Sequence, residues 1–162
     1  MTQRQPPAIT IRKGTLADLD RLIAIENAAF QGDRLSRRSL RAYLTRRNVS
    51  LLVAEATIGG FAQAIGYALL AFRKDSKKAR LYSIASDPEY RLGSGRGLGR
   101  RLLAACEEEA ARRGAESLVL EVRADNGRAI ALYEARDYVK FATIPGYYED
   151  GTSAERYEKR LV

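Results

Sequence analysis

The chain has 162 residues, of which 46% are hydrophobic and 30% charged, and its formal net charge is +8. This length fits one domain with a buried core, and no apolar run approaches the roughly 20 residues that a transmembrane helix requires. One cysteine, Cys106, and no histidine exclude an internal disulfide, a zinc site of cysteine and histidine ligands, and nucleophiles activated by histidine. Acid–base chemistry would therefore depend on Glu, Asp, Tyr or Lys, and we expect no metal.

The first seven residues are polar and contain two prolines, without the apolar core of a secretory signal. We therefore expect a disordered tail over residues 1–7, a single domain over residues 8–162 and a cytoplasmic location.

The sequence of the first half of the domain predicts four strands and two helices. Alternating β-branched residues indicate a strand from Ala8 to Arg12. Thr15 can cap a helix that ends near Phe30, and Ser36 can cap a second helix that ends near Arg46. Three further strands, expected to form an antiparallel meander, are predicted at Ser50 to Ala56, Ala64 to Phe72, and Ala79 to Ala85.

A glycine-rich stretch from Tyr90 to Arg101 follows the third of these strands and leads into a predicted helix, Leu98 to Arg113. Glycines occupy alternate positions there, at residues 93, 95, 97 and 99. A strand, a glycine loop and a helix form a phosphate cradle, because glycine lets backbone N–H groups approach an anion at the helix N-terminus. The spacing matches neither a dinucleotide fingerprint nor a P-loop. A flexible surface loop is the alternative interpretation.

The second half changes the connectivity. Ser117 to Val122 is a buried strand joined to the previous strand through a helix, so the two should be parallel. Cys106 lies on the apolar stripe of that helix and is expected to be a core residue. After it come a helix from Gly127 to Ala135 and two strands, Asp137 to Ile144 and Ala154 to Leu161.

Six arginines lie between Arg34 and Arg47. No aromatic residue other than Tyr43 is interleaved with them, so a solvated helix face is favoured over nucleic-acid binding. Attraction of an acidic partner or a polyphosphate cofactor is the alternative.

Four segments together resemble the GCN5-related N-acetyltransferase (GNAT) family. They are Ile84-Ala85-Ser86-Asp87-Pro88-Glu89-Tyr90-Arg91, Gly95-Arg96-Gly97-Leu98-Gly99-Arg100, Leu120-Glu121-Val122-Arg123-Ala124-Asp125-Asn126 and Ala129-Ile130-Ala131-Leu132-Tyr133-Glu134. Within the family, the chain looks most like the ribosomal-protein N-terminal (alanine) acetyltransferase branch.

The resemblance implies an α/β (α+β) fold. It consists of a mixed, mostly antiparallel sheet of about seven strands, flanked by about four helices and splayed between strands four and five. It also implies acetyl-CoA as the donor. The pantetheine would run along Ile84, Ala85 and Ser86, and the pyrophosphate would bind Gly95, Arg96, Gly97, Leu98, Gly99 and Arg100. Asn126 would bind the cofactor or cap a helix.

Glu121 and Tyr133 resemble the general base and general acid of this branch. Glu121 is the one carboxylate in an otherwise apolar strand, and such burial raises a carboxyl pKa toward working pH. A phenol with a pKa near ~10 can protonate a thiolate. The structural alternatives are a strand-end charge and a core tyrosine.

For the acceptor, we expect the N-terminal α-amine of a protein, since a larger fraction of it is neutral at pH 7 than of a lysine. The resemblance places the acceptor groove between Phe30 to Ser36 and Pro145 to Gly151, where a cationic amine could be held by Asp33, Tyr147, Tyr148, Glu149 and Asp150. A lysine or small amine is the alternative acceptor, and a basic binding module is a more distant alternative function.

The chain departs from the family pattern twice. Arg91 precedes the expected position by three residues, so Leu92-Gly93-Ser94 looks like an insertion that lengthens the glycine loop. Asp137-Tyr138 replaces the usual Gly-Phe, a change expected to affect a turn.

Overall fold

The computed structural model describes residues 8–93 and 97–162, which form one seven-stranded sheet in the order β1-β2-β3-β4-β5-β7-β6. β4 and β5 pair in parallel and the other neighbours antiparallel. The strands are β1 (Ile9–Lys13), β2 (Val49–Ile58), β3 (Phe61–Ala71), β4 (Lys78–Ser86), β5 (Ser117–Arg123), β6 (Val139–Ile144) and β7 (Ala154–Arg160). The helices are α1 (Leu19–Ala29), α2 (Arg37–Thr45), α3 (Pro88–Gly93), α4 (Leu98–Arg112) and α5 (Gly127–Ala135). The predicted mixed sheet is confirmed.

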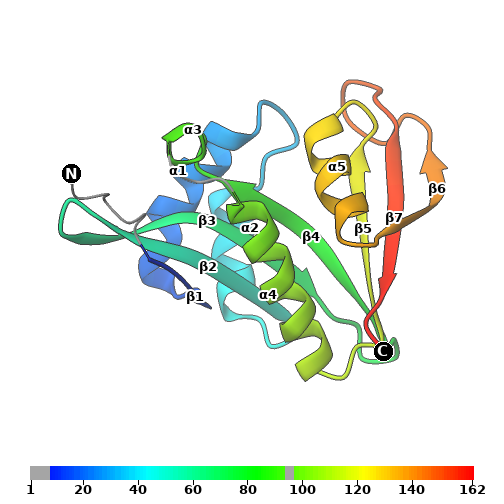
Figure 1. The fold of residues 1–162 in the computed structure, drawn as a ribbon, viewed down its shortest axis with the longest axis horizontal. Coiled ribbons are helices and arrows are strands. Elements are labelled where there is room, and N and C mark those ends of the chain that lie inside the picture. The colour runs from blue at the N-terminus through cyan, green and yellow to red at the C-terminus, as the bar shows by residue number, and fades with distance from the viewer. Residues whose placement is uncertain (1–7, 94–96) are drawn as a thin grey trace, which may run out of the picture.

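Helices cover both faces of the sheet, with α4 in front of β2 and β3, and α1 and α2 behind (Figure 1). Successive residues of β2 point to opposite faces, so Val53 belongs to the buried cluster that includes Leu22 of α1, whereas Leu52 belongs to the cluster that includes Leu102 of α4. Cys106 lies in the second of these clusters and is fully buried. Burial raises the pKa of its thiol, so the expectation of an inert core residue is confirmed.

The predicted splay lies between β4 and β5. Their pairing begins at Lys78 with Ser117 and ends at Leu81 with Leu120. Beyond that point β4 stays paired with β3, and β5 stays paired with β7. The two strands meet at one end and diverge toward the other (Figure 1). The rest of β4 therefore has one edge that is not covered by β5.

One segment differs from the prediction. The chain after Asp87 was expected to enter the glycine loop directly, but Pro88–Gly93 forms α3. Proline at a first helical position costs no hydrogen bond, and Asp87 Oδ1 accepts the N–H of Glu89 at 3.0 Å. Leu92 and Gly93 thus belong to a helix rather than to a lengthened loop. Ser94, Gly95 and Arg96 lie outside the described residues.

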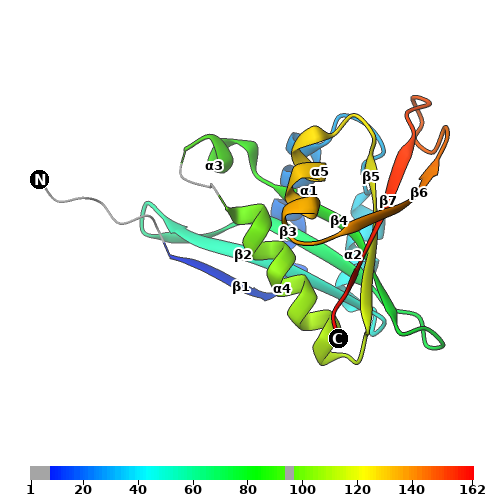
Figure 2. The ribbon, with the colours of Figure 1, turned by 45° about the vertical axis from the view of Figure 1, so that its right-hand side comes forward.

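The β6–β7 hairpin stands at the opposite end of the sheet from β1 (Figure 2). β6 begins at Val139, two residues after the predicted start, because Asp137 forms a turn with φ of 71°. This φ lies in the left-handed region that glycine favours, so the departure at Asp137 does affect a turn. None of the described helices is long and apolar enough to cross a membrane.

Candidate active site

The candidate site is the cleft that opens where β4 and β5 diverge. It has a volume of about 860 Å³. Its walls come from the two strands, from the connector between α1 and α2, from α5 and from the loop between β6 and β7. Of the residues singled out by sequence, those that line it are Asp33, Ile84, Glu121, Tyr133, Tyr147, Tyr148, Glu149 and Asp150.

Glu121 lies near the end of β5, and only 8% of its side chain is exposed. Its carboxylate oxygens lie 2.9 Å from Arg80 Nη2 and 3.3 Å from Arg156 Nε. The side chain is buried, as expected, but two ion pairs that the sequence did not predict surround its carboxylate. Arg80 lies on β4 and Arg156 on β7, so the strands on either side of β5 supply the charges that hold the carboxylate.

Tyr133 projects from α5 and is 4% exposed. Its ring packs against Tyr138 at 5.9 Å and Tyr157 at 6.4 Å between centroids. Burial raises the pKa of its phenol above the ordinary value of 10.0, so the hydroxyl keeps its proton at neutral pH. A protonated phenol that faces the cleft can act as a proton donor.

Arg123, which the sequence reasoning did not assign to the site, ties the acceptor side of the cleft together. Its guanidinium lies 2.5 Å from Asp150, 3.2 Å from Asp125 and 4.0 Å from Asp33. It also lies 4.9 Å from the ring centroid of Tyr148. The signal in the sequence was its spacing, because two residues along a strand place it on the same side as Glu121.

Two of the residues around Arg123 have shifted pKa values. The hydrogen bond from Arg123 lowers the pKa of Asp150 well below its ordinary value. Burial raises the pKa of Tyr148 to about 12. At neutral pH this wall therefore presents an ionised carboxylate and a protonated phenol.

Glu26 of α1 is a second site residue that the sequence did not reveal. It lines the cleft but is only 2% exposed. Its Oε1 accepts the N–H of Leu35 at 2.9 Å, and its Oε2 accepts the hydroxyl of Tyr67. Both oxygens are thus used to fix the connector between α1 and α2 against β3.

The start of α4 is where the sequence predicts an anion cradle. Its first helical hydrogen bond runs from Arg101 N to Gly97 O at 3.0 Å, so the amides of Leu98, Gly99 and Arg100 precede the helical ladder. Gly97 has φ of 88°, and a Cβ on Gly99 would lie 3.2 Å from Leu132. Both positions favour glycine, so these residues fit a pyrophosphate group at the helix terminus.

The remaining expected cofactor residues divide into two groups. Ile84 lines the cleft, and Ala85 and Ser86 follow it on the uncovered half of β4. Asn126 Oδ1 accepts the N–H of Ala129 at 3.1 Å, so this side chain caps α5. Gly95 and Arg96 lie outside the described residues.

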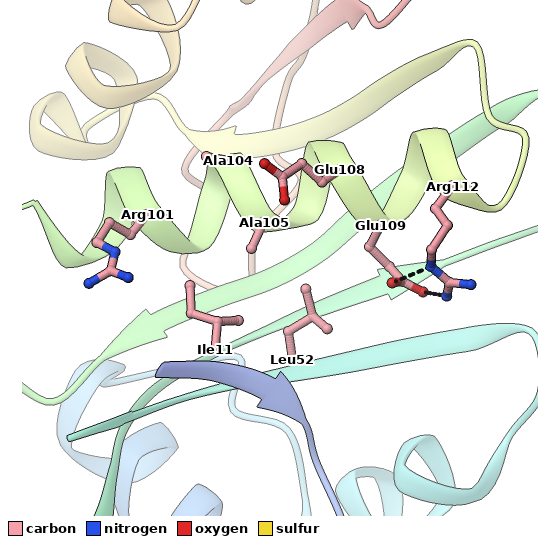
Figure 3. A pocket seen from close by; sticks show the side chains of 8 residues that line it. All are labelled: Ile11, Leu52, Arg101, Ala104, Ala105, Glu108, Glu109 and Arg112. Atoms are coloured by element: carbon pink, nitrogen blue, oxygen red, sulfur yellow. Dashed lines mark hydrogen bonds and ion pairs between the residues drawn. The ribbon is translucent and has the colours of Figure 1, made fainter. Parts of the chain in front are cut away.

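A second cavity, of about 500 Å³, lies between α4 and the strands β1 and β2. Ile11 and Leu52 point from the strands toward α4, and the Glu109–Arg112 ion pair closes one end (Figure 3). None of the predicted site residues that the structure describes lines it. Among the described residues, no group of three or more acidic or thiol side chains is placed to hold a metal ion.

The mixed sheet that splays between β4 and β5, with α4 preceded by a left-handed glycine, is an α/β architecture. The chain belongs to the acetyltransferase (GNAT) family, whose model matches residues 19–138.

Three similar proteins illustrate the relationship. An uncharacterized protein of Mycobacterium leprae, ML0378, is 32% identical over 161 residues, covering 94% of this chain and 40% of the relative. The [ribosomal protein bS18]-alanine N-acetyltransferase of Escherichia coli K12 is 44% identical over 71 residues, covering 44% of this chain and 46% of the relative. The aligned regions thus span less than half of either relative. The crystal structure of the Escherichia coli ribosomal-protein-S18-alanine N-acetyltransferase gives a TM-score of 0.81 at 29% identity, covering 95% of this chain and 94% of that one.

Proposed function

We propose that this protein is an acetyl-CoA-dependent N-acetyltransferase that acts on the N-terminal α-amine of a protein, such as a ribosomal protein. One observation carries the proposal. Glu121 and Tyr133 line the same cleft as Ile84, at the point where β4 loses its neighbour. A carboxylate, a phenol and an uncovered strand edge are what a thioester and an amine require there.

The residues of the chain have separate tasks in this proposal. The amides of Leu98, Gly99 and Arg100 hold the coenzyme's diphosphate, and the uncovered edge of β4 pairs with its pantetheine as an added strand would. The bound coenzyme supplies an acetyl thioester. Glu121 accepts the proton that the attacking amine loses, and Tyr133 gives its proton to the sulfur that departs.

The acceptor follows from charge and from acidity. An α-amine with a pKa near ~8 is roughly a tenth neutral at pH 7, whereas a lysine with a pKa near ~10.4 is neutral below about one part in a thousand. A single carboxylate base suits the first. Asp33, Glu149 and Asp150 at the cleft wall attract the ammonium form. The Escherichia coli relative is a [ribosomal protein bS18]-alanine N-acetyltransferase, which supports the same acceptor class.

Two substitutions test the chemistry. Glu121→Gln and Tyr133→Phe should each lower kcat by about 10²- to 10⁴-fold, the usual contribution of a positioned acid or base. Calorimetry should show acetyl-CoA binding unchanged in both. Tyr157→Phe is the matched control, because its ring lies 6.4 Å from that of Tyr133 while its hydroxyl donates to Glu134. Full turnover in both test variants would contradict the assigned roles.

A peptide array tests the acceptor. Peptides with a free N-terminus and no lysine should be acetylated, and the same peptides with a blocked N-terminus and one lysine should not. Mass spectrometry locates the acetyl group. The reverse pattern would favour a lysine acceptor, and acetylation of neither series would favour a small-molecule amine.

A further inference from the structure

A cationic surface runs along the solvent side of α2 and past its end. We call it the basic face and define it by the exposed residues Arg38, Arg41, Arg46, Arg47, Arg73 and Arg113. Within the described chain, none of these guanidinium groups lies within 4.0 Å of a carboxylate oxygen, the limit for an ion pair. Arg12, Arg123 and Arg136 elsewhere in the molecule are all paired.

Contacts join the parts of this face into one surface. Arg113, at the end of α4, donates from Nη2 to the carbonyl of Arg47 at 2.7 Å. Its guanidinium lies 3.9 Å from the ring centroid of Phe72. The N–H of Phe72 in turn donates to the carbonyl of Asn48 at 2.8 Å. Arg73, the next residue, is therefore held beside the end of α2. The nearby carboxylate of Glu109 is bound by Arg112 at 2.5 Å.

Folding alone does not account for these arginines. α2 has no acidic residue in its first turn and begins with Arg37 and Arg38. Cations at a helix N-terminus oppose the helix dipole, and Arg38 and Arg41 lie three residues apart on one side, where like charges repel. Arg37 is compensated by Asp20 at 2.7 Å. The other charges weaken the helix that carries them.

Aromatic rings lie among the arginines. Arg46 lies 5.4 Å from the ring centroid of Tyr43, and the Tyr43 ring lies 5.9 Å from that of Tyr82. Tyr82 is 48% exposed and lines the cleft. The sequence suggested one interleaved ring, whereas the fold adds Tyr82 and Phe72 from distant positions in the chain.

We propose that the basic face binds the phosphate backbone of RNA. Guanidinium groups donate paired hydrogen bonds that match phosphate oxygens, and the exposed ring of Tyr82, with the partly buried ring of Tyr43 beside it, can stack with bases. An acidic protein segment would meet the same charges but would leave the rings without a matching partner. The combination therefore favours a nucleic acid.

The position of the face relates it to the cleft, and this step rests on the proposed function. Arg34, which precedes α2, lines the cleft. Tyr82 also lines it, and its ring lies 5.9 Å from that of Tyr43 on α2, so the helix that carries part of the basic face lies beside the cleft. The cleft wall carries Asp33 and Asp150. The cleft wall thus presents negative charge to a terminal amine, and the basic face presents positive charge to a molecule that lies next to that amine. The acceptor proposed above, a ribosomal protein, lies beside RNA, and for this reason the proposal names RNA rather than DNA.

The test measures binding of a short fluorescein-labelled single-stranded RNA by anisotropy over a series of salt concentrations. The triple variant Arg38→Gln, Arg41→Gln, Arg47→Gln should bind at least about tenfold more weakly at low salt. Its plot of log K against log salt should be shallower by about 2, because each phosphate contact contributes about 0.7 on a single strand. The matched control, Lys13→Gln, Lys140→Gln, Arg160→Gln, has the same net charge and should keep the original slope.

Several outcomes would overturn the proposal. They are equal losses in the two triple variants, polyglutamate binding as tight as that of RNA, or a complex with DNA of the same sequence about tenfold tighter than the RNA complex. Should the first triple variant fold poorly by circular dichroism, Arg47→Glu, which lies beyond α2, must show the same direction of effect. Neither measurement uses acetyl-CoA or turnover, so loss of RNA binding and loss of the proposed acetylation would be distinguished.

Discussion

Arg123 contacts each of the segments that form the acceptor side of the cleft. Its contacts to Asp33, Asp125 and Asp150 join the connector between α1 and α2, the end of β5 and the loop between β6 and β7. Glu121 lies two residues away on the same strand. The distance between the catalytic candidate and the walls that would receive the acceptor therefore depends on one guanidinium group.

Arg123→Gln should raise the KM for an acceptor peptide by about tenfold or more, equivalent to about 1.4 kcal/mol, because Asp33, Asp125 and Asp150 would no longer be held in place by their shared cation. The KM for acetyl-CoA and kcat should change little. The exposed ion pairs themselves contribute little to folding. Steady-state kinetics with each substrate varied in turn provides the measurement.

Arg136→Gln is the control for this change. Arg136 also binds a carboxylate, that of Glu107, at 2.9 Å, and its side chain is 26% exposed against 31% for Arg123. It lies among α4, α5 and β7 rather than at the cleft. An equal rise in acceptor KM in both variants would remove the positioning role assigned to Arg123.

Asp137 offers a test of backbone strain at a single residue. Its φ of 71° suits glycine and costs a residue with a Cβ about 1–2 kcal/mol. Asp137→Gly should raise the free energy of unfolding by about 0.5–1 kcal/mol, the remainder being offset by the greater freedom of glycine in the unfolded chain. Urea denaturation measures this. A lower stability would mean that the aspartate side chain stabilises the turn.

At the scale of elements, the two ends of α4 form a matched pair. Gly97 precedes the helix with φ of 88°, and Gly114 follows it with φ of 87°, and a Cβ on either would meet no atom within 4 Å. Alanine at either position should therefore cost a similar amount, about 1–2 kcal/mol of folding free energy. Only the first lies at the proposed diphosphate cradle.

Gly97→Ala should weaken acetyl-CoA binding by about tenfold or more, and Gly114→Ala should leave it unchanged. Calorimetry gives the two affinities, and urea denaturation confirms that the two variants are equally destabilised. If the affinity fell equally in both, the loss would come from the stability of α4 and not from its N-terminal amides.

The helices and strands also show which features of the fold could be predicted from the sequence and which could not. The helix from Gly127 to Ala135, the capping by Ser36 and the parallel pairing of β4 with β5 were predictable, because each depends on local periodicity, a cap residue or a crossover connection. The splay between β4 and β5 was expected only from the resemblance to the GNAT family. α3 was missed because a helix of six residues has too few turns to show an apolar period. The ion pairs of Glu121 were missed because Arg80 and Arg156 come from other strands, and only the register of the sheet brings them together.

At the scale of the whole molecule, carboxylates form ion pairs between separate parts of the chain, and these pairs predict that the free energy of unfolding depends on pH. The hydrogen bond from Arg12 lowers the pKa of Asp18, and the hydrogen bond from Lys78 lowers the pKa of Glu158. A carboxyl with a lower pKa in the folded state stabilises it above the unfolded pKa, near ~4, and this stability is lost as the pH falls through the folded pKa. The free energy of unfolding should therefore drop below pH ~4.

Asp18→Asn isolates one of these contributions. It should cost roughly 1–3 kcal/mol at pH 7, since hydrogen bonds from Arg12 and from the N–H of Thr15 are weakened. The pH profile of the variant should also be flatter below pH ~4. Asp75→Asn, in an exposed hairpin, is the control and should reproduce the original profile. Urea denaturation at several pH values decides the matter, and a variant profile parallel to the original would contradict it.

The short pairing between β4 and β5 determines how the molecule should respond to a bound ligand. Four residue pairs, from Lys78 with Ser117 to Leu81 with Leu120, join the two parts of the sheet. One part carries Ile84, and the other carries Glu121 and Tyr133. A ligand with amide groups that hydrogen-bond to the rest of β4 would extend the contact between the two parts of the sheet. When acetyl-CoA is added, we therefore expect deuterium uptake over Tyr82 to Ser86 to slow. We also expect the thermal unfolding of the two parts to become more cooperative.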